Sequence, residues 1–130
     1  MTIKTIIFIG LTCIILAGCG PSAPKTTGPD QNKLAGEWIR TDGGYMLRIL
    51  SAAADGKLDA GYFNPGPIHV ARAEWQIRDG RMIVLVELQD VNYPGSTYTL
   101  AYLPDKDCLI GNYYQAVEKV NFDVQFVRRK

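Results

Sequence analysis

The chain has 130 residues and a mass of 14.4 kDa, a length that suits one domain rather than two. It carries 14 Lys and Arg residues against 13 Asp and Glu residues and a single histidine, so it lacks the basic surface or acidic tail that would favour a nucleic-acid partner. Hydrophobic residues make up 47% and charged residues 21%, which excludes a chain that is disordered throughout.

The first residues have the pattern of an export signal. A short start that ends at Lys4 precedes an apolar run over residues 5–17, which suits a secretory signal but is shorter than the roughly 20 residues that cross a bilayer. The run ends in a branched apolar residue, two small residues and a cysteine, Leu16-Ala17-Gly18-Cys19. This tetrapeptide resembles the lipobox of bacterial lipoproteins; an ordinary signal peptide with a chance cysteine is the alternative.

The lipobox resemblance implies a membrane-anchored protein. In such lipoproteins the cysteine becomes the new N-terminus and is acylated with fatty acids such as palmitate, so removal of 18 residues would leave 112. Two or more acyl chains on Cys19 give lasting attachment, and by the sorting rules of these lipoproteins Gly20 implies the outer membrane, facing the periplasm. Cys13 would leave with the signal, so Cys108 would remain alone and no internal disulfide is expected.

The segment after Cys19 is typical of a flexible linker. Residues 20–32 contain three prolines, two glycines and nothing apolar larger than alanine, so they cannot bury a core. Thirteen such residues have a root-mean-square reach of roughly 20 Å. The predicted organisation is therefore a signal peptide over 1–18, a lipidated cysteine and linker over 19–33, and one folded domain over 34–130.

From Leu34 onward the hydrophobic pattern alternates with a period of two. In the last such segment Val120, Phe122, Val124 and Phe126 alternate with polar residues, which is typical of a strand with one buried face. The same pattern predicts eight strands, at 34–40, 45–51, 58–63, 68–78, 81–89, 96–103, 108–115 and 119–129. Short strands with short connections predict an all-β, eight-stranded up-and-down antiparallel barrel, a size that side chains can fill or that can hold one small ligand.

Three segments resemble the opening of avidin/streptavidin-like barrels, and in a more general way lipocalin-like meander barrels. They are Leu34-Ala35-Gly36-Glu37-Trp38, Asp42-Gly43-Gly44 and residues 54–62, which end in Gly61-Tyr62. The resemblance implies a small meander barrel in which Tyr62 matches a ligand-binding tyrosine. Arg40 and Gly44 stand where the family has an Asn and a Ser that bind biotin, and no tryptophan follows Trp75. Binding of biotin itself is therefore not expected.

An up-and-down meander places alternate connections at opposite ends. The connections over 52–57, 79–80 and 104–107 are tight and charged, and they share what we call the linker end with the linker and with the basic residues 128–130. This basic tail either meets anionic headgroups or is simply solvated. The connections over 41–44, 64–67, 90–95 and 116–118 form the open end, and their irregular Gly, Pro, Asn and aromatic content is typical of recognition loops.

The strand phase turns a set of polar and aromatic side chains toward the open end. We predict that a ligand would contact Arg40, Asp42, Tyr45, Tyr62, Asn64, His69, Tyr113 and Gln115. Arg40 either pairs with an acidic neighbour such as Asp42 or is free to bind a carboxylate or phosphate through two parallel hydrogen bonds. The pattern leaves open whether the interior is hollow or packed.

Two functions fit this sequence, and neither is enzymatic. Cys108 and His69 start strands at opposite ends, and no nucleophile turn, phosphate loop, metal-ligand spacing or cofactor motif is present. The first hypothesis is a lipid-anchored barrel that binds a small polar or amphiphilic molecule at its open end. The second is an envelope protein–protein interaction module, such as an assembly factor or a protease inhibitor, which a contiguous patch around the outward-facing Ile83, Leu85 and Ile110 would favour.

Overall fold

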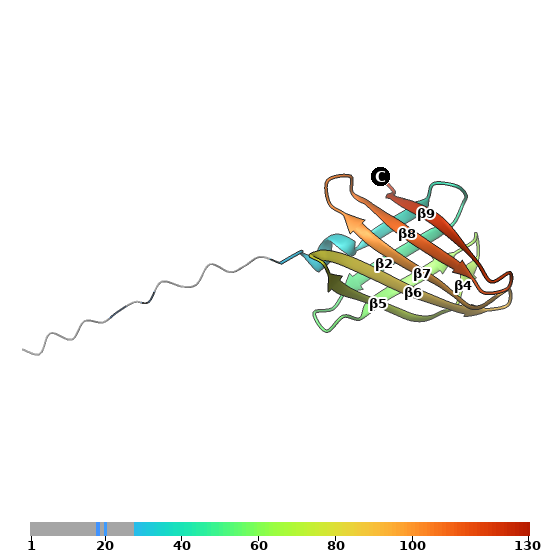
Figure 1. Cartoon of the computed structure of the whole chain (residues 1–130), viewed down its shortest axis with the longest axis horizontal. Coiled ribbons are helices and arrows are strands. Elements are labelled where there is room, and N and C mark those ends of the chain that lie inside the picture. Colours follow the sequence, from blue (N-terminus) through green and yellow to red (C-terminus); the bar gives the residue numbers. More distant parts are fainter. Residues whose placement is uncertain (1–17, 19, 21–27) are drawn as a thin grey trace, which may run out of the picture.

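The computed structural model describes residues 18, 20 and 28–130, and residues 28–130 form an all-β domain (Figure 1). One antiparallel sheet runs in the order β4-β3-β2-β1-β9-β8-β7-β6-β5. A short 3-10 helix, η1 (Gln31–Leu34), precedes nine strands in this range: β1 (Gly36–Arg40), β2 (Met46–Ala52), β3 (Leu58–Phe63), β4 (Pro67–Ile68), β5 (Val70–Arg78), β6 (Arg81–Asp90), β7 (Tyr93–Leu103), β8 (Cys108–Gln115) and β9 (Val120–Arg128).

The sheet curls into a nearly closed barrel, which confirms the predicted up-and-down architecture. Strands β1 and β9 pair antiparallel and join the two halves of the meander. The remaining seam lies between β3 and β5, where a bridge links Lys57 with Glu74 and the Trp75 amide donates to the Gly56 carbonyl at 2.8 Å. Among residues 28–130 no further strand pairing joins β3 to β5, so the barrel is nearly but not fully closed.

The nine strands differ from the predicted eight because the segment 68–78 is broken. It divides at His69 into β4 and β5, and the pairing of β5 with β6 shifts its register between Val70 and Arg72. A bulge of this kind reverses the alternation between the residues before it and those after it. Ala71, which the alternation predicts to face inward, is accordingly exposed, whereas Val70 and Ala73 pack against the core.

The first strand begins at Gly36 rather than at residue 34. The Asp30 carboxylate caps η1 by accepting from the Asn32 amide at 3.0 Å, and Gly36 then takes a φ of +147°. A Cβ at Gly36 would collide with the Arg128 guanidinium, so both conformation and space favour glycine here. At the other strand boundaries, Asp79-Gly80 turns with positive φ values of 52° and 74°, as a tight hairpin needs.

Large side chains fill the middle of the barrel. Trp38, Tyr62, Tyr98 and Phe126 are each no more than 1% exposed, and aliphatic residues of β6, β7 and β8 pack around them. The central layer is therefore packed, and the hollows described below lie at the two ends.

The predicted signal peptide and the lipidation of Cys19 fall outside the described residues and stay predictions. In the part of the chain that the structure describes, no helix has the length and apolar character needed to cross a membrane.

Candidate functional site

Connections far apart in the sequence meet at the open end. The Asn64 side-chain amide, after β3, donates to the Tyr93 hydroxyl at the start of β7 at 2.7 Å. Arg40 at the end of β1 and Gln115 at the end of β8 line one hollow together with Asn92 from the β6–β7 turn. The connections over 52–57, 79–80 and 104–107 lie at the other end, beside η1 on the left of Figure 1.

Arg40 makes the largest number of side-chain contacts described at the open end, although the residue itself is only 8% exposed. Its Nε and Nη2 donate to the two carboxylate oxygens of Asp42, the second at 2.8 Å, and its Nη1 donates to the Tyr98 hydroxyl at 2.9 Å. The guanidinium also lies over the Tyr45 ring, 4.2 Å from its centroid. Hydrogen bonding to Arg40 lowers the pKa of Asp42, and the same bond raises the pKa of Arg40. Arg40 is therefore paired within the chain and not free to take an anion.

A chain of tyrosines connects this ion pair with the core. The Tyr62 and Tyr98 hydroxyls lie 2.7 Å apart, and the Tyr113 ring stacks on the Tyr98 ring with centroids 4.4 Å apart. Burial raises the pKa of Tyr98 to about 12 and also raises the pKa of Tyr62. Both phenols are therefore neutral at physiological pH; Tyr98 accepts the hydrogen bond from Arg40, and Tyr62 in turn holds the Tyr98 hydroxyl.

The open-end hollow has a volume of about 370 Å³. Five of the eight predicted contact residues line it: Arg40, Asp42, Tyr45, Tyr113 and Gln115. Asn92, Tyr93 and Phe122 also line it and are not among the eight predicted contact residues. The sequence does indicate these residues: Asn92 and Tyr93 belong to the connection over 90–95, which is predicted to lie at this end, and Phe122 is at an inward position of its strand.

The other three predicted residues do not line the hollow. Tyr62 is buried beneath it, and Asn64 is exposed and bonded to Tyr93. His69 is exposed, contrary to its predicted inward phase, because the chain breaks between β4 and β5 there. Its Nδ1 lies 3.1 Å from the Gln89 carbonyl oxygen, and its backbone amide donates to the Asp90 carboxylate at 2.8 Å. His69 therefore links the break between β4 and β5 to the end of β6.

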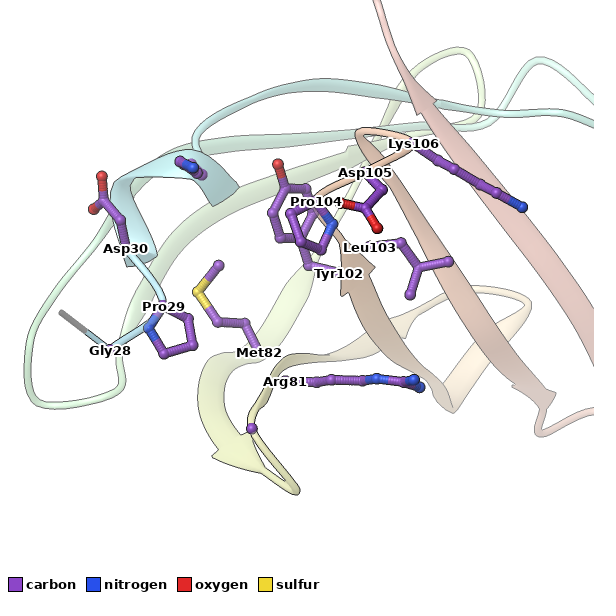
Figure 2. Close-up of a pocket in the computed structure, with 12 residues that line it drawn as sticks. Gly28, Pro29, Asp30, Arg81, Met82, Tyr102, Leu103, Pro104, Asp105 and Lys106 are labelled. Carbon is purple, nitrogen blue, oxygen red and sulfur yellow. The ribbon is translucent and has the colours of Figure 1, made fainter. Parts of the chain in front are cut away.

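A second and larger hollow, of about 700 Å³, lies at the linker end and was not predicted (Figure 2). Met82 and Tyr102, both buried, form its base, and Pro29 and Pro104 stand on opposite sides of it. We call it the linker-end groove; its remaining lining residues are Gly28, Asp30, Lys33, Gly80, Arg81, Leu103, Asp105 and Lys106.

Arg128 holds the linker side of this groove against the barrel. Its Nε donates to Asp107 at 2.7 Å, and its Nη atoms donate to the carbonyls of Ala35 and Lys33 at 2.7 and 2.6 Å. The guanidinium lies over the Trp38 ring, 4.2 Å from its centroid. The prediction that Arg128 belongs to a free basic tail is thus wrong for this residue, because it clamps η1 and β1 to β9.

Charge is distributed unevenly along the barrel. The turns and strand ends of the linker end carry eight basic and seven acidic side chains, namely Lys33, Lys57, Arg78, Arg81, Lys106, Arg128, Arg129 and Lys130 against Asp30, Glu37, Asp55, Asp59, Asp79, Asp105 and Asp107. The open end carries three basic and five acidic ones, namely Arg40, Arg72 and Lys119 against Asp42, Glu87, Asp90, Glu118 and Asp123. The linker end is therefore more basic than the open end.

The outer wall has a contiguous apolar patch. The strand registers place Ile83, Ala101 and Ile110 in one row across β6, β7 and β8. Leu103 and Val127 lie in the row beside it, on either side of Cys108, whose side chain is buried. Leu85 continues the patch along β6, and Ile110 and Val127 are 37% and 40% exposed. A contiguous apolar patch of this kind favours the hypothesis of a protein–protein interaction module.

A scan against protein-family models and searches of the curated proteins and of the solved structures find no match to this chain. Among residues 28–130, no group of three or more His, Cys, Asp or Glu side chains is arranged to hold a metal ion. The functional argument therefore rests on the hollows, patches and charges of the barrel itself.

Proposed function

We propose that this protein is a lipid-anchored envelope protein, and not an enzyme, whose barrel binds a small polar or amphiphilic molecule at its open end. The observation that carries this proposal is the hollow in which Arg40, Tyr45, Tyr113 and Gln115 converge from three different strands and connections. Its volume of about 370 Å³ is within the range of small-molecule sites.

The lining of the hollow limits the chemistry of its ligand. Because Arg40 and Asp42 neutralise each other, the hollow offers no strong attraction for a simple anion. Asn92 and Gln115 supply amide donors and acceptors, and Phe122, which is 44% exposed, supplies an open aromatic surface. These groups favour a ligand with hydroxyl or amide groups on one side and an apolar part on the other.

The anchoring part of the proposal is supported by the sequence Leu16-Ala17-Gly18-Cys19 and by the linker-like composition that follows it. Acylation of Cys19 would attach the barrel to the periplasmic face of the outer membrane. The resemblance to avidin/streptavidin-like and lipocalin-like barrels supports a binding role in general; it does not favour biotin.

Thermal unfolding in the presence of a metabolite panel tests the ligand hypothesis. A ligand at a hundred times its Kd stabilises the folded state by about 2.7 kcal/mol, a readily measured rise in Tm. Phe122→Ala should weaken this rise, whereas Ile77→Ala, which truncates a side chain that is 51% exposed on β5, should not. If no class of ligand raises Tm, or if both variants behave alike, the proposed site is refuted.

The outer apolar patch favours a second candidate, an envelope protein–protein interaction module. A photo-crosslinking residue at Ile110 should then capture one specific partner in cells, whereas the same residue at Asn121, on the polar part of the outer wall, should not. Equal or absent capture at the two positions would count against this candidate.

A further inference from the structure

The linker-end groove combines an apolar base with basic side chains on its rim. Met82 and Tyr102 form the base, and Arg81 and Lys106 extend outward from its edge (Figure 2). Lys33 also lines the groove, and all three basic side chains are exposed. The ion pairs between residues 28 and 130 include none of these three side chains. They are therefore available to an external anion.

Two carboxylates share the rim, and they are not equivalent. Asp30 accepts from the Asn32 amide and so serves as the cap of η1. Asp105 lies in the β7–β8 turn, next to Lys106. The rim therefore keeps an excess of one positive charge, inside an end of the barrel that is more basic than the opposite one.

We propose that this groove binds the headgroup of an anionic membrane phospholipid. The phosphate would lie among Lys33, Arg81 and Lys106, and the glycerol and upper acyl region would lie against Met82 and Tyr102. The inference rests on the proposed lipid anchor, because residues 20–28 have a predicted reach of only about 15–18 Å from Cys19. A barrel anchored there would keep this end within reach of the headgroup layer.

Such a contact would orient the barrel. A lipid anchor alone would leave the domain free to rotate about the linker, whereas a headgroup in the groove fixes the linker end toward the membrane. The acidic open end would then point away from an anionic surface, and the open-end hollow would face the periplasm.

Vesicle binding by the full chain carrying Cys19→Ser tests the groove without acylation. Every variant keeps the same N-terminal apolar segment, so its contribution cancels in the comparison. Each basic side chain near an anionic surface contributes about fivefold to affinity. The triple variant Lys33→Gln/Arg81→Gln/Lys106→Gln should therefore bind phosphatidylglycerol vesicles roughly a hundredfold more weakly, and Asp105→Asn should bind about fivefold more tightly.

The control removes the same charge elsewhere, with Arg48→Gln/Arg72→Gln/Lys119→Gln, and circular dichroism checks that each variant is folded. Equal weakening by the two triple variants, or binding to neutral phosphatidylcholine vesicles as tight as to anionic ones, would overturn the proposal. If glycerol phosphate in solution competes as well as vesicles do, the groove binds free phosphate esters and the membrane role is wrong. Mass measurement of the wild-type chain tests acylation of Cys19 separately, so failure of the anchor and failure of the groove are distinguishable.

Discussion

Replacing Asp42 by asparagine should destabilise the protein, because Asp42 neutralises a guanidinium that the fold buries. The carboxylate accepts two hydrogen bonds from Arg40, whose third one goes to Tyr98. An asparagine side chain in its place would keep a single neutral acceptor and leave Arg40 with its charge unpaired in a site that is 8% exposed.

The magnitude follows from the hydrogen bonds and the exposure of the pair. A hydrogen bond to a charged group contributes about 1.5–3 kcal/mol when it is buried. The Asp42 side chain is 53% exposed, so water replaces part of what is lost and the value has to be discounted. We expect Asp42→Asn to lower the free energy of unfolding by about 1–1.5 kcal/mol, which lowers Tm by roughly 5 °C in a domain of this size.

The dependence on pH has a defined sign. The pKa of Asp42 is lower in the folded chain than its usual value near 4, so its contribution is fully present above pH 4. It is lost as the pH falls through the lowered pKa. Wild type and Asp42→Asn should therefore differ by a constant amount between pH 5 and 7 and converge below pH 4.

Urea unfolding of wild type, Asp42→Asn, Arg40→Met and the double variant measures the coupling directly. We expect about 1 kcal/mol of coupling between Arg40 and Asp42. The exposed Arg72–Glu87 pair, with its closest atoms 3.7 Å apart, is the control and should show less than about 0.5 kcal/mol. Equal coupling in the two pairs, or a difference between wild type and Asp42→Asn that persists in acid, would refute this account of Arg40.

Three further predictions concern the framework. In urea unfolding, Gly111→Ala should lower the free energy of unfolding by about 2 kcal/mol, because the added methyl group would collide with a backbone carbonyl of β7. Gly66→Ala is the control and should change this free energy little, because nothing lies within 4 Å of the added atom. Arg128→Gln should speed amide hydrogen exchange in η1 and at the start of β1, and Arg129→Gln, whose side chain is 61% exposed, should not. Arg128 lowers the pKa of Asp107, so the stability advantage of wild type over Arg128→Gln in urea melts should hold above pH 4 and shrink below it.

The barrel could be predicted because its strands carry a local signal. In β6, β7 and β9 most inward positions are apolar or aromatic, the buried Ser96 of β7 being an exception. The buried face follows the alternation from Met82 to Leu88 and from Tyr98 to Tyr102. Turn residues such as Asp79-Gly80 mark the hairpins locally as well. Alternation and turns together define a meander without any knowledge of long-range contacts.

The errors lie where long-range pairing overrides the local pattern. The sequence over 68–78 alternates like one continuous strand. In the structure its first residue pairs with β3 and most of the rest pair with β6, and the break at His69 and the bulge after it allow both pairings. Arg128 looked like part of a basic tail because its partners, Ala35 and Lys33, lie more than 90 residues away in the sequence. The linker-end groove depends on these long-range hydrogen bonds of Arg128, so no local sequence pattern predicts it.

The packed middle of the barrel has a consequence for how the two hollows operate. Trp38, Tyr98 and Phe126 fill the layer between them, so a molecule bound at the open end has no path through the interior to the linker end. The two sites also differ in charge: the open-end hollow contains a paired and neutral Arg40–Asp42, whereas the linker-end groove has three unpaired basic side chains among the described residues. Substitutions at one end share no partner with those at the other, so their effects on stability should add. The packed layer thus separates the two hollows, so the proposed ligand site at the open end and the proposed lipid contact at the linker end can each be tested without disturbing the other.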